Sequence, residues 1–194
     1  MKKSKLILFA MAFAAFSFVS QSAFAQNNFK VNVENSTLNW KGYKPTGSHT
    51  GIITLASGNI AIKNNKLTGG SFVVKMSTIK DADGSAKLEG HLKSADFFDV
   101  AVYPTAKFDI IKSEIKGTKI QVTGNLTIKG ITKQITFPAT LAVSKDALTL
   151  TSETFQINRA DFNVKYKSKT FFNDLKDKFV NDEFDFQVTI VAKK

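Results

Sequence analysis

Apolar and polar residues alternate along most of this chain with a period of two. Residues 131–143 place Ile131, Phe137 and four further apolar residues on one face, with mostly polar residues between them. Residues 120–128 and 184–192 repeat the pattern. Such alternation is typical of antiparallel strands that have one buried face and one solvated face.

Weaker versions of the same pattern predict five more strands, separated by short turns. These strands cover residues 37–44, 50–58, 69–77, 104–115 and 147–158. Clusters of Gly, Asn, Ser and Lys predict turns at 57–59, 63–66, 69–70, 116–118, 129–130 and 144–146. About eight closely spaced strands without βαβ units indicate an all-β fold, either a sandwich or an antiparallel up-and-down barrel.

Two of these strands contain an irregularity. Within residues 147–158 the apolar phase changes between Leu150 and Phe155, which predicts a bulge or a bend. Pro138 has no N–H group to donate to a strand ladder, so we expect it at a sheet edge or a bulge.

One segment has helical spacing instead. Within residues 85–95, Leu88, Leu92 and Ala95 recur at i, i+4 and i+7, with charged residues such as Glu89 between them. This spacing predicts a short amphipathic helix with a narrow apolar stripe. Asp83 or Ser85 can cap its first turn.

This helix is too short to be stable alone in water, so its apolar face must pack on another element. The dry interior of a barrel that is open at one end offers such a surface. Two adjacent aromatic residues, Phe97 and Phe98, follow the helix. We therefore expect the helix and these residues to form a lid over the opening. Because the chain leaves helical geometry here, we expect the two rings to point to different sides.

The first 25 residues predict a secretory signal peptide. Three lysines precede an apolar run over residues 6–19, and Ala23 and Ala25 form an A-x-A cleavage signal. The run is shorter than the roughly 20 residues of a membrane span, although an N-terminal membrane anchor remains the alternative. We expect cleavage after Ala25, a periplasmic protein and a single mature domain over residues 26–194.

Composition narrows the function classes. The absence of cysteine excludes a disulfide scaffold, thiol catalysis and a lipid-modified cysteine. The net charge is +11, and removing the three leader lysines with no acidic residue leaves +8. Arg159 is the one arginine, which argues against nucleic acid, where bidentate arginine contacts dominate base recognition. The scattered lysines indicate solvated strand faces, with transient attraction to an anionic membrane surface as the alternative.

The sequence contains no G-x-S-x-G motif, no H-E-x-x-H motif and no phosphate-binding glycine loop, and we expect no cofactor and no metal site. The two histidines, His49 and His91, are 42 positions apart, so the fold would have to bring them together for a metal or catalytic pair. An enzyme acting on an amphiphilic envelope molecule, with His49 or His91 as its base, is the alternative function.

Arg159 lies two residues before Asp161, in a stretch that continues to Phe162. One interpretation is a structural ion pair that closes one end of the barrel. The other is a cation that binds an anionic head group at the cavity mouth.

Phenylalanine is abundant: of 18 in the chain, five lie in the first 25 residues, so 13 remain in the mature protein. Many have the inward parity of a strand. They indicate either an ordinary core or a barrel whose inner surface exceeds what side chains fill. An eight-stranded barrel of the second kind can hold one small ligand.

Four segments resemble the YceI-like family of exported bacterial lipid-binding proteins. They are residues 90–108 (GHLKSADFFDVAVYPTAKF), 48–79, 122–138 and 158–166, in the family's order. The resemblance implies a lipocalin-like antiparallel barrel with a helix against its opening and a cavity that binds polyisoprenoid chains. The chain departs from the family at Asn163, where glycine is usual. Because asparagine tolerates left-handed backbone angles, we expect the same turn.

Together these observations predict a non-catalytic carrier of a polyisoprenoid or another long-chain amphiphile. A secreted stress-response factor without a defined ligand remains a further alternative. The oligomeric state is not predicted. The residues expected to contact the ligand are Trp40, His49, Phe72, Leu92, Phe97, Phe98, Phe108, Arg159 and Phe162.

Overall fold

The computed structural model describes residues 26–194, so the expected signal peptide lies outside the described residues. No helix among these residues is long and apolar enough to cross a membrane. Ten strands, one α-helix and two 3-10 helices follow one another along the chain. They are β1 (Asn27–Val31), β2 (Thr37–Lys44), β3 (Gly47–Lys63), β4 (Lys66–Asp81), α1 (Ala86–Lys93), β5 (Thr105–Lys116), β6 (Lys119–Ile128), β7 (Ile131–Val143), β8 (Ala147–Ser152), β9 (Phe155–Asn158), η1 (Arg159–Phe162), η2 (Lys176–Lys178) and β10 (Glu183–Lys193).

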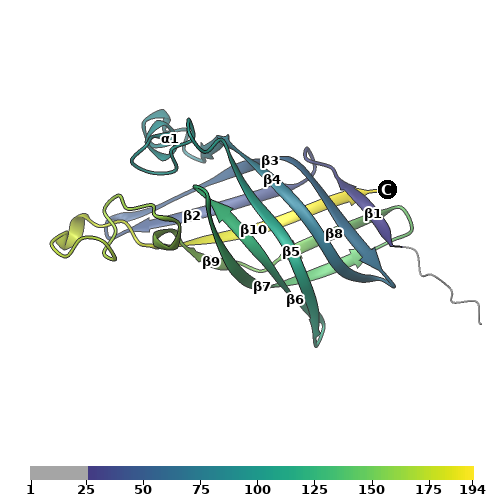
Figure 1. Ribbon diagram of the computed structural model, residues 1–194. Coiled ribbons are helices and arrows are strands. Elements are labelled where there is room, and N and C mark those ends of the chain that lie inside the picture. The colour runs from purple at the N-terminus through teal and green to yellow at the C-terminus, as the bar shows by residue number, and fades with distance from the viewer. Residues whose placement is uncertain (1–25) are drawn as a thin grey trace, which may run out of the picture.

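Eight of the strands close into an antiparallel barrel. The order runs β10-β2-β3-β4-β5-β6-β7-β8, and β8 pairs with β10 to complete the ring. The short strand β1 pairs with both β10 and β3, while β9 pairs with β10. Helix α1 and the segment between β9 and β10 lie at one end of the barrel, and the chain's C-terminus lies at the other (Figure 1). The predicted all-β, lipocalin-like barrel is confirmed.

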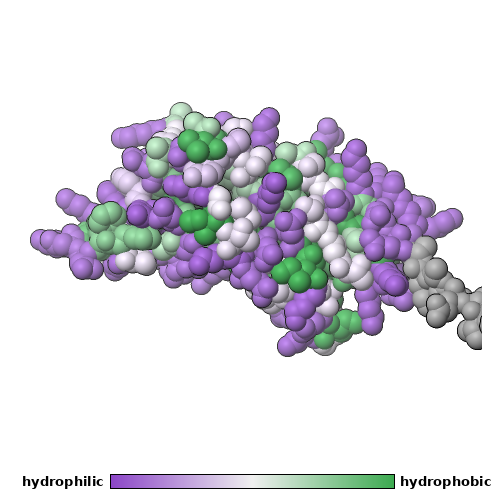
Figure 2. Space-filling view, viewed as in Figure 1, coloured by the Kyte–Doolittle hydropathy of each residue, from purple (hydrophilic) through white to green (hydrophobic). Residues whose placement is uncertain are grey.

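The alternation in the sequence corresponds to the two faces of the barrel wall. The inward residues of β7 and β10 that the pattern identified belong to or pack against one continuous buried cluster. Most of the outer surface seen in Figure 2 is hydrophilic, with isolated hydrophobic residues among the polar ones. Burial of the inner face therefore holds the fold together without any disulfide.

The turns predicted at 57–59 and 69–70 are wrong, because these residues lie inside β3 and β4. Their glycines serve close packing instead. A Cβ on Gly58 would lie 2.9 Å from a methyl group of Val31, and one on Gly70 would lie 2.8 Å from the carbonyl oxygen of Asn59. A register shift between Leu55 and Ser57 lets β3 continue past this point. The turn predicted at 63–66 does join β3 to β4: Asn64 and Asn65 both have positive φ, as a two-residue hairpin requires.

Residues 147–158 form two strands, β8 and β9, so the phase change in the sequence marks a true break. Pro138 corrects a prediction, since it lies in β7 between β6 and β8 and not at a sheet edge. Its carbonyl accepts from the N–H of Glu153, just beyond the last residue of β8. The backbone nitrogen of Pro138 faces the same side, beyond the last residue pair of β7 and β8, so the missing N–H interrupts no pairing inside β8.

Helix α1 begins at the predicted cap, because the Ser85 hydroxyl accepts from the N–H of Leu88 at 3.3 Å. Leu92 is buried as expected, but Ala95 is exposed beyond the end of the helix. Glu89, expected among the solvent-facing residues, is buried. Its carboxylate accepts from Lys80 Nζ at 2.9 Å and from the backbone N–H of Asp81 at 3.2 Å. Glu89 thus joins the helix to the end of β4 through charge-assisted hydrogen bonds.

This arrangement predicts a pH dependence for the lid. The hydrogen bond from Lys80 is the main reason why the pKa of Glu89 lies below its ordinary value. A lowered pKa in the folded state stabilises the protein above the unfolded pKa, and the stabilisation disappears as the pH falls through the folded value. We expect the protection factors of the α1 amides, which compare the observed with the intrinsic exchange rate at each pH, to fall on acidification in the wild-type protein but to change much less in Glu89→Gln. Parallel acid profiles for the two proteins would contradict this role.

Candidate ligand-binding cavity

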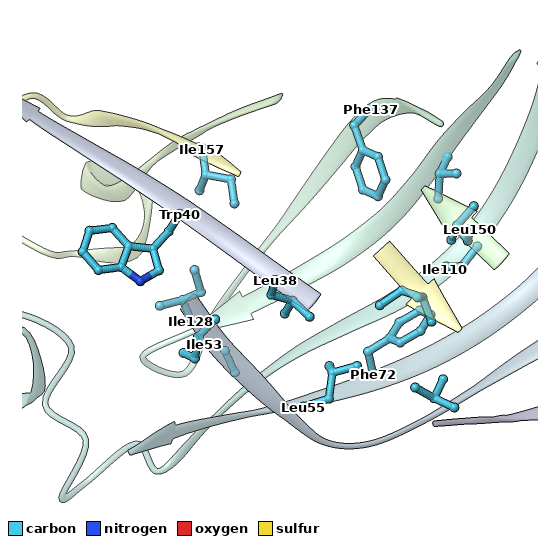
Figure 3. Close-up of a cluster of buried hydrophobic side chains, with 14 of the residues drawn as sticks. Leu38, Trp40, Ile53, Leu55, Phe72, Ile110, Ile128, Phe137, Leu150 and Ile157 are labelled. Carbon is cyan, nitrogen blue, oxygen red and sulfur yellow. The ribbon is translucent and has the colours of Figure 1, made fainter. Parts of the chain in front are cut away.

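The barrel encloses a cavity of about 170 Å³. Each of the eight ring strands contributes to its wall, and α1 and the segment before β10 close one end. Figure 3 shows Trp40, Phe72 and Phe137 extending from different strands into this interior. Apart from Arg159 and Asn181, every residue that lines the cavity is apolar or glycine, and eight are phenylalanine: Phe72, Phe97, Phe98, Phe108, Phe137, Phe155, Phe184 and Phe186. An interior lined almost entirely by apolar side chains from all eight ring strands suits an apolar molecule.

Seven of the nine residues expected to contact a ligand line this cavity, namely Trp40, Phe72, Leu92, Phe97, Phe98, Phe108 and Arg159. The two exceptions are His49 and Phe162. His49 lies near the start of β3 with its ring toward Asp81, and Phe162 is buried in the core. Neither lines the cavity, so the expectation of ligand contact has no geometric support for them. The phenylalanines of β9 and β10 were missed, although the strand alternation already placed those of β10 on the inner face.

Two glycines determine where the cavity's aromatic side chains lie. A Cβ on Gly51 would fall 2.5 Å from the Trp40 indole, and one on Gly124 would fall 2.4 Å from the Phe108 ring. Gly51 lies directly opposite Trp40 on the neighbouring strand, and Gly124 lies on β6, the strand that pairs with the strand of Phe108. The missing side chains of these glycines leave room for the two aromatic rings. Phe108 in turn packs near Phe72 and Phe137, with ring centroids 6.4 and 5.6 Å away.

Gly124→Ala should therefore damage the cavity. The new methyl group would also meet the Asp109 carbonyl oxygen at 2.6 Å, so strand and ring must both shift. Overpacking of this kind costs about 1–3 kcal/mol, and the displaced Phe108 ring would reduce the ligand space. We expect a lower Tm and weaker binding of a fluorescent isoprenoid analogue. Gly69→Ala is the matched control, because its Cβ meets its nearest neighbour at 3.9 Å. Equal behaviour of the two variants would show that Gly124 does not shape the cavity.

Phe97 and Phe98 correct an expectation. Both are 8% exposed, and both line the cavity, so they do not point to opposite sides. The chain does not become extended after α1 but turns back on the helix: the N–H of Phe97 donates to the Ser94 carbonyl, and the N–H of Phe98 donates to the Leu92 carbonyl. The strict alternation of side chains that an extended segment would show is therefore absent, and the two rings share one wall.

The two rings nevertheless have different surroundings. The Phe97 ring lies 5.9 Å from the ring of His91, 6.4 Å from that of Tyr166 and 5.4 Å from the Arg159 guanidinium. Within residues 26–194, the only aromatic ring that packs against Phe98 is Phe97 itself, at 5.1 Å. Phe97 therefore has more ring and guanidinium partners than Phe98, although both residues border the cavity.

Arg159 is buried, and its donors are engaged within the protein. Nε donates to the Asn181 carbonyl at 3.0 Å, Nη1 to that of Val164 at 2.8 Å and Nη2 to that of Val180 at 2.9 Å. Nη2 also lies 3.2 Å from the Asp182 carboxylate, so the ion-pair partner is Asp182 and not the exposed Asp161. Burial lowers the pKa of the guanidinium, and the nearby carboxylates oppose that effect. These contacts favour the structural interpretation of Arg159.

The turn after Arg159 has the predicted conformation. Asn163 ends η1 with φ 58° and ψ 32°, in the left-handed region, and its N–H donates to the Ala160 carbonyl. Asparagine therefore occupies this position in the way expected of glycine.

The histidines lie outside the cavity wall. His91 packs against the ring of Tyr166, with centroids 4.3 Å apart. His49 Nδ1 lies 3.5 Å from a buried oxygen of Asp81, and among residues 26–194 these two with Asp83 form the one group whose ligand atoms fall within 4.8 Å. Their nitrogen and oxygen atoms are of the types that a divalent cation takes. The second oxygen of Asp81 accepts from the N–H of Ser85, so the group joins β3 to the start of α1.

Comparison with known proteins agrees with this architecture. The model of a family described as the YceI-like domain matches residues 29–192. A UPF0312 protein of Pseudomonas putida is 37% identical over 86 residues, which cover 43% of this chain and 44% of that protein. The match thus spans less than half the length of this curated relative.

Two solved structures share the fold. Burkholderia cenocepacia BcnA superposes with a TM-score of 0.70 at 23% identity, covering 84% of this chain and 99% of that one. A polyisoprenoid binding domain from Saccharophagus degradans, implicated in plant cell wall breakdown, has a TM-score of 0.63 at 14% identity, covering 85% of this chain and 97% of that one. At these identities the similarity shows the fold alone.

Proposed function

Because the chain belongs to the YceI-like family, we propose that it is an exported, non-catalytic carrier whose barrel holds a polyisoprenoid or a similar long-chain amphiphile. The observation that carries the proposal is the cavity, which is lined from every strand of the ring and is almost entirely apolar. A long apolar chain gains about 0.8 kcal/mol for each CH₂ group removed from water, before the costs of ordering are subtracted. Sequestering such a chain is a sufficient function for this interior.

The fold and one structural neighbour support the ligand class. That neighbour is named for polyisoprenoid binding, and it shares the barrel over most of this chain. The lack of charged groups on the wall, apart from the internally paired Arg159, supports an uncharged chain inside and a polar head group outside.

Native mass spectrometry of the protein purified from its own envelope tests the proposal. We expect a mass increment that disappears on lipid extraction and an extract that contains a long-chain isoprenoid or related amphiphile. A folded protein that carries no lipid and does not bind a fluorescent isoprenoid analogue would overturn the carrier function.

The enzyme alternative receives no support from the site geometry. Neither His49 nor His91 lines the cavity, so neither is placed to act as a base on a molecule held there. A variant with both histidines replaced by glutamine should retain its bound lipid. Accumulation of a chemically different lipid in that variant would instead favour an enzyme.

Export is a part of the proposal that depends on residues 1–25. We expect the mature protein to begin at Gln26 and to be released by osmotic shock, as the A-x-A signal at Ala23 and Ala25 predicts. Intact mass identifies the cleavage site directly. Recovery of the uncleaved chain in the membrane fraction would contradict both the compartment and the free carrier.

A further inference from the structure

The segment between β9 and β10, residues 159–182, is long for a connection in a barrel. It is nevertheless fixed at its base. The N–H of Val180 donates to the Lys167 carbonyl, and the Thr170 hydroxyl donates to Asp182 at 2.8 Å. Lys167 and Lys176 have positive φ of 48° and 46°. Strained backbone of this kind persists where the surroundings enforce it, and it is frequent at functional sites.

Two adjacent phenylalanines protrude from this segment. Phe171 is 39% exposed and Phe172 is 48% exposed, although both backbone N–H groups donate to the Ser168 carbonyl. The ordered turn therefore presents both rings to solvent. Figure 2 shows a hydrophobic patch on this projecting end of the molecule, bordered by hydrophilic residues. An exposed apolar patch with a polar rim marks an interaction surface.

The segment that carries the two rings is rich in lysine. Residues 165–179 contain five lysines against two aspartates, which gives this segment a net charge of +3. Lys165 Nζ lies 5.2 Å from the centre of the Phe171 ring, and Lys169 Nζ lies 3.4 Å from that of Phe179. Aromatic rings flanked by ammonium groups match the interface of an anionic bilayer, where rings enter the head-group region and lysines meet phosphates.

The same segment reaches the cavity. Val180 and Asn181 line it, and the Tyr166 ring contacts both His91 of α1 and Phe97 of the lid. In Figure 1 the segment and α1 lie together at one end of the barrel. A bilayer seated on the exposed phenylalanines would therefore face the end of the barrel that the lid closes.

We propose that residues 165–179 form a membrane-docking surface that binds anionic phospholipid bilayers through Phe171, Phe172 and the surrounding lysines. The inference rests on the proposed carrier function, because it identifies the donor or acceptor of the lipid as a membrane. Docking brings the lidded end of the cavity to the bilayer surface, where a lipid enters or leaves without crossing bulk water.

Flotation with vesicles tests this surface. The mature protein is mixed with vesicles of phosphatidylglycerol and phosphatidylethanolamine, or of phosphatidylcholine alone. We expect binding to the anionic vesicles that weakens with salt. Replacing both Phe171 and Phe172 with serine should weaken it about tenfold or more. Each lysine replaced by glutamine should weaken it roughly fivefold. Ile115→Ser is the matched control, because Ile115 is 66% exposed on β5 near the β5–β6 turn, outside this segment.

Lipid content and Tm are measured on every variant. If the double serine variant floats like Ile115→Ser, or if the wild-type protein binds soluble polyglutamate but not vesicles, the membrane surface is refuted. Normal lipid content together with absent flotation would refute docking and leave the carrier function intact. Flotation by a protein that never retains lipid would refute the carrier function and leave docking intact.

Discussion

Replacing Arg159 with alanine should lower the free energy of unfolding by about 3–5 kcal/mol. The substitution leaves the carboxylate of Asp182, a buried residue, without its cationic partner. It also removes the donors to the carbonyl groups of Val164, Val180 and Asn181. The bond to the Val164 carbonyl is buried, and a buried acceptor that loses its partner retains the full cost of desolvation, so this loss adds to that of the ion pair. Denaturant unfolding of the purified variant measures the change.

Asp161→Ala is the control for this experiment. Asp161 is exposed and adjacent in sequence but is not the partner of Arg159, so its removal should change stability by less than about 0.5 kcal/mol. Similar losses in the two variants would mean that Asp161 contributes to the pair after all. Ligand binding separates the two interpretations of Arg159. A structural residue affects lipids with phosphate and neutral head groups alike, whereas selective loss of the phosphate-bearing lipid would reveal a head-group contact.

Much of the fold could be predicted because the barrel wall has one apolar and one polar face. Where one face is buried and the other solvated, as in β7 and β10, the period-two pattern directly records the strand. The prediction of turns failed where a glycine is needed because atoms of a neighbouring strand approach its backbone closely. Gly58 and Gly70 resemble turn residues in sequence, but in the structure they admit a neighbouring methyl group and a carbonyl oxygen. Such contacts join residues from different strands and leave no local signal.

The site was predictable to the extent that inward parity and aromatic content identify a cavity wall. Trp40, Phe72 and Phe108 were found in this way, whereas the glycines that accommodate two of them depend on cross-strand geometry. The partner of Arg159 was misjudged for a related reason. Asp161 is close in sequence, but Asp182 is brought to the guanidinium by the return of the chain into β10.

Replacing the two adjacent phenylalanines of the lid, Phe97 and Phe98, should give the second large effect. Phe97→Ala should cost about 3–5 kcal/mol, the usual range for removing a buried phenylalanine whose surroundings are filled by protein. The Phe97 ring contacts His91, Tyr166 and the Arg159 guanidinium. An alanine at this position would remove the ring from all three contacts. Phe98→Ala should cost less stability, because within the described residues the Phe98 ring has Phe97 as its one aromatic partner and otherwise borders the cavity. The main effect of Phe98→Ala should be a faster release of the bound lipid.

Thermal unfolding and stopped-flow release of a fluorescent isoprenoid analogue measure the two effects on the same preparations. Phe97→Leu and Phe98→Leu serve as conservative controls and should lie between wild type and alanine in each assay. The assignment reverses if Phe98→Ala is the less stable protein and Phe97→Ala releases ligand faster, since the contacts of Phe97 would then not determine stability. If both alanine variants lose stability and release ligand at the wild-type rate, the two rings are ordinary core and the lid lies elsewhere.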